Sequence, residues 1–169
     1  MSKFIQRCRG AGGQRTAHPG VRAILLGSLG GFLAICALAL LSSSLDVTLL
    51  LGSFGASCVL VFGYPDGPFA QPVNVIAGHF ICTVIGLAAF HFIGPQPWVL
   101  ALAVGCSIAV MMATSTVHPP AGSNPVIVFL AHSGWGFLLF PVVTGALILV
   151  LFGWLYNNAV RKTPYPNYW

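Results

Sequence analysis

The chain has 169 residues, of which 57% are hydrophobic and only 5% are charged, and its mean hydropathy is +0.90. Soluble domains carry roughly 25% charged residues, so this composition excludes a soluble globular domain and predicts an all-α polytopic membrane protein. Seven Lys and Arg residues against two acids give a net charge of +5. We attribute this charge to membrane orientation and not to nucleic acid, because no folded surface remains to present a basic patch.

The basic residues lie at the two ends of the chain, outside the apolar runs. Those before the first run are Lys3, Arg7, Arg9, Arg15 and Arg22, and those after the last are Arg161 and Lys162. The positive-inside rule therefore predicts that both termini are cytoplasmic, in a bacterial inner membrane, and that the number of crossings is even. We divide the chain into a basic N-terminal segment (1–22), a transmembrane region (23–158) and a C-terminal tail (159–169).

Four apolar runs are predicted to cross the bilayer, since a spanning helix needs about 20 apolar residues. In chain order these runs are 23–41, 75–93, 98–113 and 137–156. Two shorter segments, 47–63 and about 121–132, are rich in small residues or interrupted by proline. If both dip into the membrane and return, the protein has four full spans. If both cross, it has six.

The order of long and short segments suggests a two-fold internal repeat, because residues 23–93 and 98–157 each read long, short, long. Two registers compete, residues 70–76 on 123–129 or, with a one-residue gap, residues 55–62 on 121–129. Transporter sites lie where such repeats meet, and short interrupted segments point to them.

The most unusual stretch of the chain, residues 114–125, leads into the second short segment. This stretch is polar and holds three prolines, yet it lies between apolar runs. Lipid cannot hydrogen-bond a free N–H or C=O, so irregular backbone at membrane depth must be buried in protein or line a cavity. The pattern predicts a functional site, with a simple proline kink as the alternative.

The polar groups at membrane depth favour an anion. A cation pathway normally has intramembrane acids, but Asp46 and Asp66 both fall in predicted connections. The sequence around Asn124, before Pro125, fits the start of a half-helix capped by Ser123 or Asn124, and such starts attract negative charge. The predicted interior therefore offers hydrogen-bond donors but no carboxylates.

The candidate substrate contacts come from both short segments and the helix between them. They are Ser53, Ser57, Asn74, His79, Thr116, His118, Gly122, Ser123 and Asn124. His118 is either a cap or interhelical hydrogen-bond partner, or an anion contact that gains charge near neutral pH. For His79 a packing hydrogen bond is the alternative, and for Asn74 it is a helix cap.

Enzyme chemistry and bound cofactors are not expected. No nucleophile, base and carboxylate stand together in the sequence. The five cysteines are single and widely spaced, without the spacing of a zinc site. We expect neither a metal nor another cofactor.

The stretch His118-Pro119-Pro120-Ala121-Gly122 resembles the motif for which the HPP family of small integral membrane proteins is named. Further matches are residues 52–57, 65–72 and 74–79, in the family's order. The resemblance implies four transmembrane helices and, from members in cyanobacteria and plastids, nitrite transport. The expected function is a transporter or channel for a small monovalent anion, with nitrite as the first candidate. The expected partners are this anion and the lipid bilayer, and a homo-oligomer remains open. The alternative is a non-transporting scaffold or subunit of a larger complex.

Overall fold

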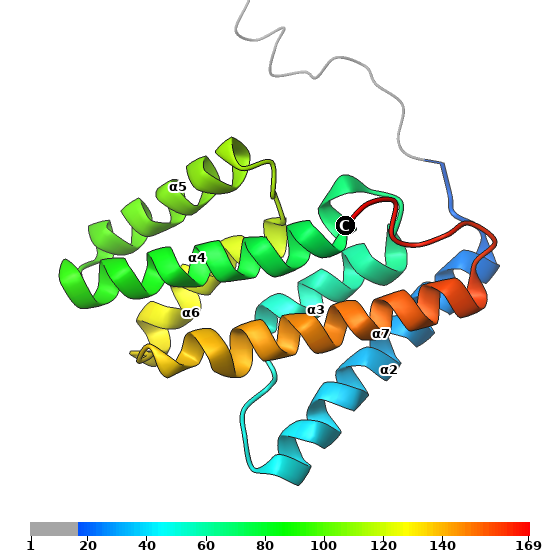
Figure 1. The fold of residues 1–169 in the computed structure, drawn as a ribbon, viewed down its shortest axis with the longest axis horizontal. Helices are drawn as coiled ribbons and strands as arrows, with labels where there is room; N and C mark the ends of the chain where they lie inside the picture. The colour runs from blue at the N-terminus through cyan, green and yellow to red at the C-terminus, as the bar shows by residue number, and fades with distance from the viewer. Residues whose placement is uncertain (1–16) are drawn as a thin grey trace, which may run out of the picture.

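The computed structural model describes residues 17–169, and this part of the chain is helical without strands (Figure 1). The helices are α2 (Val21–Leu45), α3 (Gly52–Cys58) with a π-helical extension (Val59–Gly63), α4 (Pro72–Phe92), α5 (Pro97–Ala113), α6 (Asn124–Ala131) preceded by a 3₁₀ turn (Pro119–Ser123), and α7 (Thr144–Val160) preceded by a π-helical turn (Leu138–Val143). The predicted all-α class is confirmed. Residues 1–16 of the predicted basic segment 1–22 lie outside the part of the chain that the structure describes.

Three helices are long and apolar enough to cross a membrane. They are Val21–Leu45, Pro72–Phe92 and the combined helix Leu138–Val160, which is kinked at Phe140, where φ is −125° and ψ is 119°. Helix α5 is apolar but has only 17 residues. These helices correspond to the four predicted long runs.

The first short segment, residues 46–63, runs back along α2. Near the end of α2, the Ser42 hydroxyl accepts a hydrogen bond from the Leu49 N–H at 2.9 Å. Near the start of α2, Gly27 packs against the end of this segment, since a Cβ added at Gly27 would be 3.1 Å from the Phe62 carbonyl oxygen. The segment is extended first and helical afterwards, and it returns to the end of the bundle where α2 begins. It therefore traverses the bundle and does not turn back halfway.

The second short segment, together with the loop before it (residues 114–131 in all), lies along α4 and runs parallel to it. The Asn74 side-chain amide, near the start of α4, donates to the Val117 carbonyl at 3.1 Å. Further along, Gly86 packs against Pro125. This segment also traverses the bundle, so the structure favours six traversals over four spans with two re-entrant segments.

The two halves of the chain contain the same three elements in the same order. The first half is α2, α3 and α4, and the second is α5, α6 and α7. Three traversals per half reverse the direction of the chain, so α2 and α5 begin at opposite ends of the bundle (Figure 1). The register that pairs residues 55–62 with 121–129 joins equivalent elements. The other register pairs the start of α4 with α6, which are not equivalent.

Two glycines let the second short segment approach α4 closely. A Cβ added at Gly78 would be 2.8 Å from the His118 Cβ, and one at Gly86 would be 2.8 Å from the Pro125 Cα. Real Cβ atoms are not found at such distances, so α4 accepts this neighbour only without side chains at these positions. Small residues at helix contacts are the usual means of close packing in lipid.

The ends of the described chain lie at the same end of the bundle. The Tyr156 hydroxyl of α7 donates to the Leu26 carbonyl of α2 at 2.7 Å. The tail that follows α7 folds back over the start of α4, where the Tyr165 hydroxyl donates to the Ala70 carbonyl at 2.8 Å. This agrees with the predicted even number of crossings.

Candidate functional site

Four polar side chains meet where the two short segments pack beside α4. Ser57 comes from α3, His79 from α4, His118 from the loop before the 3₁₀ turn, and Asn124 from the start of α6. All four are 0% exposed. The Ser57 Oγ lies 2.7 Å from His118 Nε2 and 3.0 Å from His79 Nε2. We call these four residues the Ser57 cluster.

One backbone carbonyl sets the direction of hydrogen bonding through the Ser57 cluster. His118 Nδ1 lies 2.7 Å from the Phe69 carbonyl oxygen, which only accepts, so Nδ1 carries a hydrogen. In a neutral His118, Nε2 is then an acceptor and takes the Ser57 hydroxyl hydrogen. The Ser57 oxygen in turn accepts from His79 Nε2–H. His79 Nδ1 is left as an acceptor for the Asn124 amide at 3.0 Å.

The same geometry accommodates exactly one additional hydrogen without breaking a contact. If both nitrogens of His118 carry hydrogen, Ser57 Oγ accepts from both imidazoles. Its own hydrogen then turns to the Ser53 carbonyl oxygen, which lies 3.0 Å away one helical turn earlier. A hydroxyl is the side chain suited to this exchange, because it is both donor and acceptor and rotates freely. The hydrogen-bond geometry therefore permits either the neutral or the protonated form of His118.

The Asn124 end of the cluster has a defined orientation. Its Nδ2 donates to His79 Nδ1 and, at 2.8 Å, to the Thr83 hydroxyl. Thr83 donates in turn to the His79 carbonyl at 2.7 Å. Near the cluster, two buried side-chain atoms have no hydrogen-bond partner among the described residues, Asn124 Oδ1 and Ser53 Oγ. Unpaired buried polar atoms are costly and uncommon.

The His-Pro-Pro sequence explains how His118 reaches this position. Pro119 and Pro120 occupy the first two positions of the 3₁₀ turn, where a backbone N–H would have no helical partner and its loss costs little. The preceding loop is held by Asn74, whose amide donates to the Ser115 and Val117 carbonyls. His118 is thus fixed from both sides, and its side chain makes no capping bond.

The structure brings together some of the predicted contacts and separates others. Ser57, His79, His118 and Asn124 converge, and Ser53 lies one turn from Ser57. Asn74 is buried but binds the loop and caps no helix. Ser123, Thr116 and Gly122 lie outside the cluster.

The predicted cap at Ser123 is wrong. Its hydroxyl donates to the Pro120 carbonyl at 2.8 Å and is exposed, and neither Ser123 nor Asn124 caps α6 with its side chain. The Thr116 hydroxyl pairs with that of Thr114 at 2.7 Å on the exposed side of the loop. The 3₁₀ turn before α6 already supplies the backbone bonds that a cap would supply.

Two groups of the site were missed by sequence reasoning. The Phe69 carbonyl is a main-chain atom, for which a sequence carries no signal. Thr83 follows His79 by four residues, so the helical spacing placed both on one face. Within the described residues, no three His, Cys, Asp or Glu side chains stand close enough to share a metal ion.

A family model described as HPP, transmembrane region, matches residues 16–166. The chain belongs to the HPP family. The His-Pro-Pro tripeptide of this HPP chain places His118 in the Ser57 cluster.

Two transmembrane proteins of Dictyostelium discoideum are similar to this HPP chain. One is 39% identical over 153 residues, which cover 83% of this chain and 54% of the relative. The other is 37% identical over 153 residues, covering 83% of this chain and 49% of the relative. The chain thus spans about half the length of these relatives. No solved structure matches it.

Proposed function

We propose that this HPP protein moves a small monovalent anion across the membrane, with nitrite as the first candidate. The observation that carries the proposal is the Ser57 cluster, which joins the two short segments at the meeting of the two halves. Broken segments at a repeat interface are where transporters bind substrate. The orientation with both termini in the cytoplasm of a bacterial inner membrane is part of the proposal.

The chemistry of the cluster suits an anion more than a cation. Its groups are one hydroxyl, two imidazoles and one amide, and no carboxylate stands among them. The Ser53 hydroxyl has no partner and offers a hydrogen to an incoming oxyanion. The extra proton that Ser57 and His118 accommodate would offset the anion's charge, so we propose that anion and proton move together.

A non-transporting scaffold is the second candidate, and the burial of the cluster favours it. His79 and His118 are 0% exposed and line none of the three cavities described for this structure. Transport therefore requires a second conformation in which the cluster opens to water. A scaffold requires none.

Flux through liposomes distinguishes the two candidates. Purified protein would be reconstituted and tested with nitrite, nitrate, formate and chloride at about pH 6 and about pH 8, on either side of the usual histidine range. We expect nitrite uptake that is faster at the lower pH and falls at least about 10-fold in His118→Ala, the loss expected when about 1.4 kcal/mol is withdrawn. Ser123→Ala is the control, since its hydroxyl faces away from the cluster. Wild-type flux equal to that of empty liposomes for all four anions would refute transport.

A further inference from the structure

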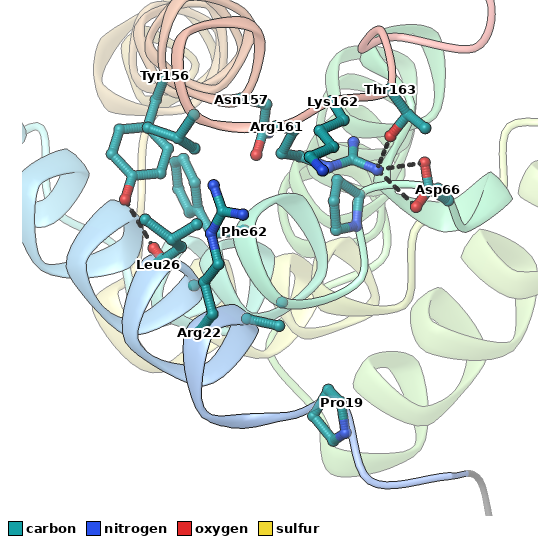
Figure 2. A pocket seen from close by; sticks show the side chains of 15 residues that line it. Pro19, Arg22, Leu26, Phe62, Asp66, Tyr156, Asn157, Arg161, Lys162 and Thr163 are labelled. Carbon is teal, nitrogen blue, oxygen red and sulfur yellow. Dashed lines mark hydrogen bonds and ion pairs between the residues drawn. The ribbon is translucent and has the colours of Figure 1, made fainter.

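A cationic pocket of about 380 Å³ opens at the end of the bundle where both ends of the described chain lie (Figure 2). It is formed between the start of α2, the end of α7 and the turn after α3. Three of its lining residues are basic, Arg22, Arg161 and Lys162, and one is acidic, Asp66. The pocket shares no residue with the Ser57 cluster.

The single acid of the pocket is already neutralised. Arg161 Nη2 lies 2.6 Å from both carboxylate oxygens of Asp66. Arg22 and Lys162 take part in no ion pair within residues 17–169, and Figure 2 shows Arg22 extending from α2 toward the end of α7. Two positive charges are therefore left without a counter-charge at one site.

The pocket also contains a buried donor that nothing satisfies. Arg161 Nη1 is buried and has no hydrogen-bond partner among the described residues. An unpaired buried N–H of a charged group is costly, and a rotation of the Arg161 side chain would be needed to bring this group to an oxygen of a bound anion. Guanidinium groups bind phosphate oxygens particularly well because of their planar set of donors.

An apolar groove adjoins the pocket and extends into the membrane region. Its volume is about 690 Å³, and it shares four residues with the pocket, namely Pro19, Ala23, Gly27 and Gly63. Along α2 it continues to Cys36. Thirteen residues of helix from Ala23 correspond to about 20 Å, which is more than half of a hydrocarbon core of about 30 Å.

We propose that the pocket and groove together bind an anionic phospholipid. Its phosphate would contact Arg22, Arg161 and Lys162, and an acyl chain would lie in the groove along α2. The charge of the pocket favours an anionic headgroup over a zwitterionic one, since basic residues at the membrane surface attract anionic lipid. The groove favours a lipid over a free phosphate, because only a lipid fills both spaces.

Thermal unfolding of the full-length protein in detergent tests this proposal. The delipidated protein would be titrated with phosphatidylglycerol, with phosphatidylcholine of the same chain length, and with inorganic phosphate. We expect phosphatidylglycerol to raise the Tm by about 5 °C, as a ligand that binds only the folded state does. Phosphatidylcholine and phosphate should each raise it by less than about 1 °C.

Two sets of variants separate the headgroup from the acyl chain. Arg22→Gln combined with Lys162→Gln should weaken phosphatidylglycerol binding at least about 10-fold and leave the lipid-free Tm unchanged, because both side chains are exposed. Ser28→Trp should block the groove, which Ser28 lines from its exposed position, whereas Ser28→Ala should not.

Three results would overturn the proposal. Equal Tm shifts from phosphatidylglycerol and phosphatidylcholine would show that the headgroup charge does not matter. A Tm shift from inorganic phosphate equal to that from phosphatidylglycerol would show that the acyl chain does not matter. Unchanged phosphatidylglycerol binding in the double variant would place the lipid elsewhere. Anion flux does not enter any of these measurements, so the lipid site and the proposed transport fail independently.

Discussion

Ser53 and Ser57 of α3 offer a matched pair of substitutions, because both are buried serines on one face of one helix. Ser57 bonds to two imidazoles, whereas Ser53 Oγ has no partner within the described residues. Replacing either by Ala removes one oxygen from the interior. The structure predicts a large loss of stability for Ser57→Ala and almost none for Ser53→Ala.

The magnitude for Ser57→Ala follows from the groups it leaves behind. The Nε2 atoms of His79 and His118 each lose their partner, and an unpaired buried group costs about 1–3 kcal/mol. Hydrogen bonds between membrane helices lie toward the low end of that range, so we expect a total loss of about 3 kcal/mol. For a chain of this size, this corresponds to a fall in Tm of about 6–12 °C.

Ser53→Ala should change stability by less than about 0.5 kcal/mol, because no hydrogen bond of the Ser53 hydroxyl is lost. If this hydroxyl donates to the passing anion, however, nitrite flux in liposomes should still fall several-fold. Thermal unfolding in detergent and liposome flux, measured on the same preparations, check both statements. Equal stability losses in the two variants would refute the hydrogen-bond network derived for the Ser57 cluster. An Ser53→Ala variant with full flux would remove this hydroxyl from the anion's path.

Two further predictions concern packing and pH. Gly86→Ala should destabilise the protein by about 1–3 kcal/mol, since the new Cβ would be 2.8 Å from the Pro125 Cα. Gly105→Ala is the control: a Cβ there would meet nothing within 4 Å, so this change should be neutral or stabilising by up to about 1 kcal/mol. Thermal unfolding of the two variants compares them. Burial raises the pKa of the Tyr165 phenol, so the folded state holds this proton more tightly than the unfolded state and stability should fall as the pH rises above about 10. Tyr165→Phe should abolish that dependence in thermal unfolding measured across alkaline pH, and an unchanged dependence would assign it to another group.

Much of the fold was predictable from the sequence because lipid leaves few options for the backbone. The long apolar runs predicted the long helices, and the prolines after Val117 predicted a break. The direction of the short segments was not predictable, since it depends on which neighbour each one packs against. Gly27 and Gly86 decide this by admitting close contact, and small residues occur on too many faces for the sequence to single out these two.

The candidate site was predicted in part for a similar reason. The pairing of two interrupted segments correctly suggested that Ser57 and His118 approach one another. The local pattern Ser123-Asn124-Pro125 suggested that neighbouring polar residues act together, yet one side chain faces outward and the other inward. A single step along a helix turns a side chain by about 100°. Only the packing of α6 against α4 decides which of the two faces the interior.

The opposed directions of the two halves give the position of the Ser57 cluster a further meaning. His79 lies seven residues from the start of α4 at Pro72 and thirteen from its end at Phe92, which correspond to about 10 Å and about 20 Å of helix. The thickness of protein over the cluster is therefore unequal on the two sides. If α2–α4 took the arrangement now held by α5–α7, and the reverse, the thin and thick sides would change places. The thicker layer of protein over the cluster would then lie on one side of the membrane in the first arrangement and on the other side in the second.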